Sequence, residues 1–147
     1  MVEKVLGVAK KTKIVAIIEA RMTSSRSPGK HMLPVNGKPI IEYLIMRLKK
    51  VPSLNEIVLA VTTNSTDQPL IELANKTGIS YFLGSENDVM SRVIGAAESV
   101  EGRIIVGITG DCPLLDPLIV EQSIQMFIHN NCSYVNNAAI PGYPGGM

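Results

Sequence analysis

The sequence has 147 residues, 46% of them hydrophobic and 18% charged, which predicts one folded domain with a hydrophobic core and excludes a disordered chain. The formal net charge is +1 and aromatic residues make up 4%, so neither a basic field nor a stacking platform indicates a nucleic-acid partner. The apolar run 14–18 is too short for a signal peptide or a membrane span. We therefore expect a cytoplasmic protein with no membrane partner, in which Cys112 and Cys132 are free thiols.

Strands and helices alternate along the chain. Residues 1–12 show no clear hydrophobic period, and we interpret them as an N-terminal extension of a domain that covers 13–147. Continuous apolar, β-branched runs predict strands that are covered on both faces, at 13–18, 56–61, 79–83, 103–108 and 132–137. Apolar side chains at helical spacing predict helices over 41–48, 70–77, 89–100 and 120–128. This alternation predicts a three-layer α/β domain with a mostly parallel sheet and right-handed crossovers.

Three residues mark the ends of these predicted helices. Pro39 stands at the expected first helical position of the first helix, because proline needs no N–H partner there. Gly78 is a plausible left-handed C-cap of the second helix, and Asp116 before Pro117 predicts the N-cap of the fourth.

Four polar loops follow four of the predicted strands. They cover 19–30, 62–68, 84–92 and 109–116. In open α/β sheets, ligands bind beyond the carboxyl ends of the strands, so we expect these loops to converge on one site.

The first loop reads "EARMTSSRSPGK" from Glu19 to Lys30. It carries three cations and four small hydrogen-bonding side chains: Arg21, Arg26 and Lys30, with Thr23, Ser24, Ser25 and Ser27. The loop does not match a Walker A motif, because Ser24 stands where the first glycine of that motif belongs and His31 follows the lysine. The remaining interpretations are a solvated basic loop and a cradle for a triphosphate, which arginine forks and backbone N–H groups suit.

Two further loops carry candidate ligands. Asp111 follows a buried strand and precedes Cys112-Pro113, where a single carboxylate serves either as a turn residue or as a ligand of Mg²⁺. In "GSENDVMSR", Ser85 or Asn87 can cap the next helix and Asp88 lies in its first turn. Arg92 then forms an i, i+4 pair with Asp88, or the helix start faces the ligand. His31 and His129 are solitary in sequence, and we assign them no role.

The order and spacing of these loops resemble a known family. "ARMTSSRSPGK" resembles the A-R-x-x-S-[ST]-R-L-P-G-K loop of the sugar cytidylyltransferases, and the branch involved in polysaccharide biosynthesis is the most similar. The segments "LPVNGKPIIEYLIMRLKK", "EIVLAVTTNSTD", "GSENDVMSRVIGAAE" and "ITGDCPLLDP" match in the same order, so the resemblance covers about 13–144. The family pattern has Leu where Ser27 stands.

The resemblance implies a nucleotide-diphospho-sugar transferase fold, which is Rossmann-like, and transfer of a cytidylyl group from CTP to a sugar hydroxyl with Mg²⁺ and release of pyrophosphate. It implies that Arg26, Lys30 and Asp111 are catalytic and that Asp111 holds the metal. The implied nucleotide-binding residues are Ala20, Arg21, Ser24, Ser25, Arg26, Lys30, Thr62, Thr63, Ser85, Asp88 and Arg92. Relatives continue beyond the position of "PGYPGGM", so we expect the fold to be incomplete at its C-terminus, without the sugar-binding and dimerisation part.

Two alternatives remain beside a complete enzyme. The first is a nucleotide-binding module that needs a partner chain for turnover, and an exposed sheet edge would favour self-association into a homodimer. The second is a uridylyl- or guanylyl-type transferase, which the absence of paired glycines in "ARMTSSR" disfavours.

Overall fold

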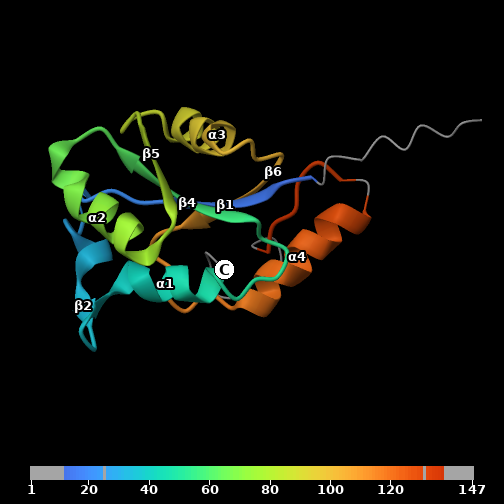
Figure 1. Cartoon of the computed structure of the whole chain (residues 1–147), viewed down its shortest axis with the longest axis horizontal. Coiled ribbons are helices and arrows are strands. Elements are labelled where there is room, and N and C mark those ends of the chain that lie inside the picture. Colours follow the sequence, from blue (N-terminus) through green and yellow to red (C-terminus); the bar gives the residue numbers. More distant parts are fainter. Residues whose placement is uncertain (1–11, 25, 131, 138–147) are drawn as a thin grey trace, which may run out of the picture.

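A computed structural model describes residues 12–24, 26–130 and 132–137 of the chain. The expected N-terminal extension, residues 1–11 of it, and the segment 138–147 lie outside the described residues, as does Ser25. Figure 1 shows one sheet between two layers of helices, so the predicted three-layer α/β fold is confirmed.

The sheet has four strands in the order β5-β4-β1-β6, and all its neighbours are parallel. The strands are β1 (Ile14–Glu19), β4 (Glu56–Thr62), β5 (Ser80–Gly84) and β6 (Ile104–Thr109). The chain runs outward from β1 to β4 and β5 and then returns to place β6 on the other side of β1. The strand order therefore reverses between β1 and β6, which is where open α/β sheets form their ligand crevice.

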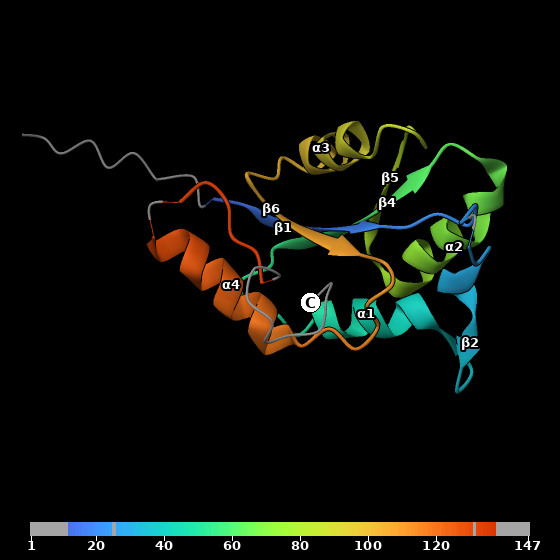
Figure 2. The ribbon, with the colours of Figure 1, turned by 180° about the vertical axis from the view of Figure 1, so that it is seen from behind.

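The helices divide between the two faces of the sheet. α3 (Val89–Ser99) covers one face, while α1 (Ile40–Leu48), α2 (Gln68–Thr77) and α4 (Pro117–His129) lie on the other (Figures 1 and 2). Alternate residues of β1 explain this arrangement, because Val15 and Ile17 pack with α3 whereas Ala16 and Ile18 pack with the core under α1. A strand that is buried on both faces reads as a continuous apolar run, as the sequence of β1 does.

The helix ends follow local chemistry. Gly78 ends α2 with φ = 66°, the left-handed conformation that glycine adopts without strain. The Asp116 carboxylate accepts a hydrogen bond from the Leu118 N–H and caps α4. Pro39 is the N-cap of α1 rather than its first helical residue, so that prediction was one position off.

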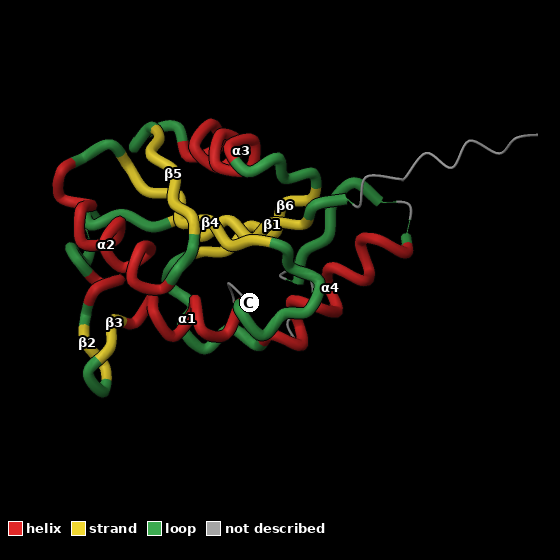
Figure 3. The backbone as a smooth tube through the Cα atoms, viewed as in Figure 1, coloured by secondary structure: helices red, strands yellow, loops and turns green. Residues whose placement is uncertain are grey.

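Two differences from the sequence predictions concern β-structure. A short hairpin of β2 (Pro34–Val35) and β3 (Lys38–Pro39) lies between the first predicted loop and the first predicted helix, where no element was predicted (Figure 3). Its turn residues, Asn36 and Gly37, both have positive φ, as tight hairpin turns require. The strand predicted at 132–137 was wrong: the structure contains no strand there, because no neighbouring strand pairs with that segment.

Candidate functional site

A polar cleft of about 470 Å³ lies at the carboxyl ends of the strands, beside the reversal point between β1 and β6. Its walls come from the loops after β1, β5 and β6. The lining residues that carry charge are Glu19, Arg21, Arg26, Lys30, Glu86, Arg92 and Asp111. The convergence of these three loops at one edge confirms that part of the sequence expectation.

The loop after β1 is fixed to β4 by a fully buried carboxylate. Asp67 is 0% exposed and accepts the Met22 N–H at 2.7 Å through one oxygen. Its other oxygen accepts the Thr62 N–H at 2.9 Å and the Thr62 hydroxyl at 2.7 Å. A buried carboxylate with three donors is a strong anchor, because each of those donors would otherwise lose its partner. The start of the loop is therefore held in place from within the protein.

A second carboxylate joins the loops that follow β1, β4 and β5. Glu86 accepts hydrogen bonds from the Thr23 hydroxyl, from the Asn64 side-chain amide at 2.6 Å and from Arg21 at 3.3 Å. The hydrogen bonds from Thr23 and Asn64 lower the pKa of Glu86 below its usual 4.5. Glu86 is consequently ionised at neutral pH and holds one side of the cleft together.

The loop closes on itself at its far end. The Gly29 N–H donates to the Met22 carbonyl at 2.9 Å, and Gly29 has φ = 70°, which a side chain would strain. A short 3₁₀ turn at Lys30–Met32 follows. Ser24 and Arg26 lie within this closed loop and line the cleft, with Arg26 exposed. The loop thus presents an exposed cation on backbone that is itself held by hydrogen bonds.

Three side chains meet where β6 ends. The Lys30 Nζ lies 2.5 Å from Oδ2 of Asp111, and the His31 Nδ1 lies 3.5 Å from its Oδ1. His31 is 5% exposed, and burial lowers its pKa, so it is neutral at pH 7. Its Nδ1 lies 3.2 Å from the Gly110 carbonyl, and Nδ1 must carry the proton to donate there. His31, which the sequence left solitary, therefore helps to position the Gly110-Asp111 backbone.

Gly110 leaves no room for a side chain at this point. A Cβ added there would lie 2.8 Å from the Glu19 carbonyl oxygen and 2.9 Å from the His31 ring. The Gly110 N–H also donates to the Glu19 carbonyl at 3.0 Å. The loops after β1 and β6 therefore touch through backbone, which brings Asp111 next to Lys30.

The start of α3 differs from its prediction. Asp88, rather than Ser85 or Asn87, is the N-cap, and it accepts the Ser91 N–H at 2.9 Å. Arg92 does not pair with Asp88: its guanidinium donates to the Ser85 carbonyl, its side chain is 3% exposed, and its Nε has no partner. Arg92 also lines the cleft, so this buried cation contributes positive potential to the site.

The structure brings most of the predicted site residues together. Those that line the cleft are Ala20, Arg21, Ser24, Arg26, Lys30, Arg92 and Asp111. Those that do not are Thr62, Thr63, Ser85 and Asp88, and Thr62 instead donates to Asp67. Ser25 lies outside the described residues. Sequence reasoning missed Glu86, Asn64, Asp67 and His31; the first three lay inside loops that it had singled out, and His31 lies one residue beyond the first loop.

The side chains around Asp111 suit a metal site with a single protein carboxylate as ligand. Within the described residues, no group of three or more His, Cys, Asp or Glu side chains is arranged to hold a metal ion. A single carboxylate beside several cations fits a divalent ion such as Mg²⁺, which keeps several waters and takes its other ligands from an anionic ligand. Asp111 is the residue that would hold such an ion. In the same described ranges, no helix is both long and apolar enough to cross a membrane.

Comparison with known proteins gives independent evidence of the family to which the chain belongs. A family model described as Cytidylyltransferase matches residues 15–142. The chain is 38% identical over 128 residues to an uncharacterized protein of Methanocaldococcus jannaschii, covering 87% of this chain and 53% of that one. It is 31% identical over 125 residues to the spore coat polysaccharide biosynthesis protein SpsF of Bacillus subtilis, covering 82% and 52% of the two chains.

Two solved structures are similar in both fold and sequence. One is a cytidylyltransferase from Leptospira borgpetersenii, with a TM-score of 0.78 and 38% identity, covering 82% of this chain and 50% of that one. The other is CMP:2-keto-3-deoxy-manno-octonic acid synthetase complexed with CTP, with a TM-score of 0.67 and 28% identity, covering 78% and 47%. The chain thus spans about half the length of the relatives that it matches.

Proposed function

Because the chain belongs to the cytidylyltransferase family, we propose that its cleft binds CTP with Mg²⁺ and supports transfer of the cytidylyl group to a sugar hydroxyl, with release of pyrophosphate. The single observation that carries this proposal is that Asp111 lies beside Lys30 in a cleft at the reversal point of the sheet that Arg21 and Arg26 also line. Cations suit the phosphates of a metal–triphosphate complex, and a carboxylate suits its metal ion.

The chemistry needs positioning and charge stabilisation more than it needs a protein nucleophile. A sugar oxygen attacks the α-phosphorus while the bond to pyrophosphate breaks, so negative charge grows on the leaving group. Arg26 and Lys30 both line the cleft, and in this proposal they would bind those phosphates and stabilise the departing pyrophosphate. When bound, Mg²⁺ would supply a Lewis acid and a template, and Asp111 would hold it.

The ion pair between Lys30 and Asp111 gives this proposal a physical consequence. Each group neutralises the other in the free protein, at 2.5 Å. On nucleotide binding, Lys30 would exchange the Asp111 carboxylate for phosphate oxygens, which frees that carboxylate for the metal. CTP and Mg²⁺ should therefore bind with positive coupling. Either ligand separates Lys30 from Asp111, so the second ligand to bind no longer has to break that ion pair.

Two relatives suggest the acceptor class. SpsF is described as a polysaccharide biosynthesis protein, and the synthetase solved with CTP is described by an eight-carbon keto-deoxy acid sugar. We infer that the acceptor is an acid sugar or a related sugar destined for a surface polysaccharide, and that the reaction takes place in the cytoplasm.

A second candidate function is a CTP-binding module that turns over only with a partner chain. The observation in its favour is that the chain matches about half the length of its relatives. Arg21, Arg26, Lys30 and Asp111 all lie within this chain, so binding of CTP is expected under both functions.

Titration calorimetry with CTP and Mg²⁺ tests the binding proposal. We expect Arg26→Ala and Asp111→Ala each to weaken binding by about 10- to 100-fold, since each removes a charge-assisted contact of ~1.5–3 kcal/mol. Arg103→Ala is the matched control, because it removes an exposed cation just before β6, at the end of the sheet away from the cleft. Equal weakening by all three variants would indicate a nonspecific charge effect and would overturn the proposed site.

Two further measurements separate the alternatives. A competition panel of CTP, UTP, GTP and ATP should favour CTP, whereas preference for UTP or GTP would support the uridylyl- or guanylyl-type alternative. Release of pyrophosphate with 3-deoxy-manno-octulosonate as acceptor reports turnover. Binding of CTP without pyrophosphate release would favour the module that needs a partner chain.

A further inference from the structure

The Asp111 carboxylate has different neighbours on its two oxygens. Oδ2 lies 2.5 Å from Nζ of Lys30, and Oδ1 lies 3.5 Å from Nδ1 of His31. Lys30 and His31 are consecutive residues of the 3₁₀ turn Lys30–Met32. One short turn in the connection after β1 therefore delivers both contacts to a carboxylate that follows β6.

The two contacts differ in how firmly they are held. The His31 side chain is 6% exposed, and its ring lies against Gly110, where an added Cβ would meet the ring atoms Cε1 and Nδ1 at 2.9 and 3.1 Å. The Lys30 side chain is 28% exposed and carries its ammonium on a flexible four-carbon stem. A phosphate can therefore draw Lys30 away from Asp111, whereas the ring of His31 is packed in place.

The surroundings of the His31 ring decide where its proton lies. Nδ1 faces the Gly110 carbonyl at 3.2 Å and the Asp111 carboxylate, both of which are hydrogen-bond acceptors. Nδ1 therefore carries the proton and donates it between them. Burial lowers the pKa of His31, so the ring supplies this N–H without a positive charge. The negative charge of Asp111 consequently stays available to a cation once Lys30 has turned to another anion.

We propose that His31 is a positioning residue, which holds the Asp111 carboxylate at the cleft after Lys30 has moved to the nucleotide phosphates. This inference rests on the proposed function, in which Lys30 exchanges Asp111 for phosphate and Asp111 holds Mg²⁺. A carboxylate that is already fixed loses less conformational freedom when it binds an ion. His31 should therefore govern how strongly Mg²⁺ enhances the binding of CTP, and should have little effect on CTP alone.

Titration calorimetry with CTP, in saturating Mg²⁺ and in EDTA, measures this enhancement as the ratio of two dissociation constants. His31→Leu fills the place of the ring without a donor and should lower the ratio about 10-fold, as is typical when a hydrogen-bond partner of a metal ligand is removed. Its affinity for CTP in EDTA should change less than about twofold. His31→Asn places an amide N–H where Nδ1 stands, so its ratio should stay within about threefold of the wild type.

His129 offers a matched control for these variants. Its Nδ1 also contacts a backbone carbonyl, that of Gln125 at 2.8 Å, at the exposed end of α4. His129→Leu should leave both dissociation constants within about twofold of the wild type.

Three results would overturn the inference. His31→Leu could weaken CTP binding equally with and without Mg²⁺, which a merely structural role would produce, or it could leave the ratio unchanged. His31→Asn could lose as much of the ratio as His31→Leu, which would show that the N–H at Nδ1 plays no part.

A measurement on the free wild-type chain needs no substitution at His31 and no nucleotide, so it also covers the case in which His31→Leu does not fold. Correlation spectra of the imidazole ¹H and ¹⁵N nuclei should place the proton on Nδ1, and Asp111→Ala should shift the resonance of that proton. A proton on Nε2, or an unchanged resonance in Asp111→Ala, would overturn the inference even if CTP binds. Failure of the wild type to bind CTP would instead overturn the proposed function, while these spectra still report whether His31 contacts Asp111.

Discussion

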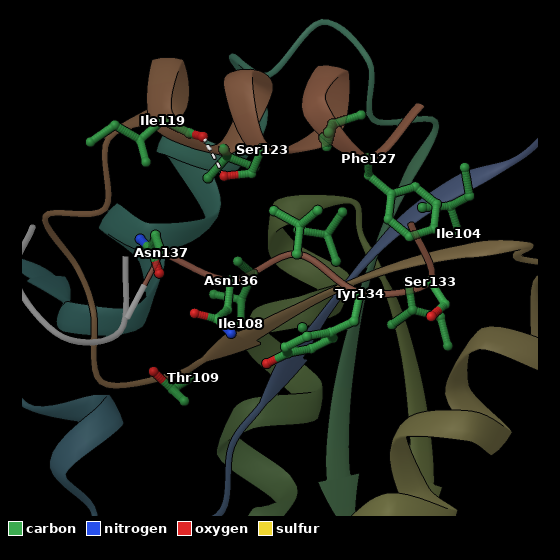
Figure 4. A pocket seen from close by; sticks show the side chains of 16 residues that line it. Ile104, Ile108, Thr109, Ile119, Ser123, Phe127, Ser133, Tyr134, Asn136 and Asn137 are labelled. Carbon is green, nitrogen blue, oxygen red and sulfur yellow. Dashed lines mark hydrogen bonds between the residues drawn. The ribbon is translucent and has the colours of Figure 1, made fainter. Parts of the chain in front are cut away.

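The cleft and a groove along β6 are hollows of similar size that are built in opposite ways. In the cleft, Glu86 and Asp111 are already held by partners within the chain, and Asp67 anchors the loop from beneath. In the β6 groove, a hollow of about 410 Å³ between β6, one side of α4 and the segment 133–137 (Figure 4), the lining is mostly apolar. The polar groups of the cleft are thus held by partners within the chain, whereas the outer edge of β6 has no partner strand among the described residues.

The largest effect is expected from removing the anchor of the cleft. Asp67→Ala leaves three donors on Met22 and Thr62 without their acceptor. Each buried unpaired group costs ~1–3 kcal/mol, so we expect a loss of at least about 3 kcal/mol in the free energy of unfolding. Urea denaturation measures it. Asp116→Ala, which removes only the partly exposed cap of α4, should cost about 1 kcal/mol. Equal losses in the free energy of unfolding would show that Asp67 stabilises the fold no more than an ordinary helix cap does.

A pair of glycine substitutions compares the two regions directly. A Cβ on Gly84 would lie 2.7 Å from Cγ of the buried Arg92, whereas a Cβ on Gly107 meets nothing within 4 Å. Overpacking a filled site costs ~1–3 kcal/mol, so Gly84→Ala should destabilise the fold by that amount. Gly107→Ala should stay within about 0.5 kcal/mol of the wild type. Thermal unfolding of both variants checks this. If the two change stability equally, the region around Arg92 is no better packed than the free edge.

The smallest effect concerns pH. The pKa of Glu86 is lowered from 4.5, so its contribution to stability is present above about pH 4.5 and is lost as the pH falls through the folded-state value. In Glu86→Gln this loss is absent. The difference in Tm between the wild type and this variant should therefore shrink as the pH is lowered below about 4.5.

Thr23→Val provides the control for that experiment. It removes the hydrogen bond that contributes most to the lowered pKa of Glu86, and it should reproduce part of the same pH dependence. A difference in Tm that stays constant from pH 7 to acid would show that the interactions of Glu86 do not depend on its charge.

Much of the fold could be predicted because it rests on local patterns. Buried positions in β1 and β4 are continuous apolar runs, and those in α1 are apolar residues at helical spacing. Both patterns can be seen in the sequence alone. The strand predicted at 132–137 failed because a strand also needs a neighbour, which its own residues do not reveal. The hairpin around Asn36-Gly37 was missed although that dipeptide is a strong turn signal.

The site was predictable at the level of loops and less so at the level of contacts. Arg21, Arg26, Lys30 and Asp111 follow strands whose ends must converge in a parallel sheet. The hydrogen bond from Met22 to Asp67 joins residues 45 positions apart, and no local pattern marks it. The role of Glu86 likewise depends on donors from two other loops, which only the folded arrangement brings together.

The most direct test of the account is to map where CTP binds by amide chemical-shift changes with Mg²⁺ present. We predict the largest changes between Ala20 and Lys30 and at Gly110 and Asp111, with little change at Ile105, Gly107 and Tyr134. Absence of any change, or changes centred on the β6 groove, would contradict the assignment of the polar cleft as the nucleotide site.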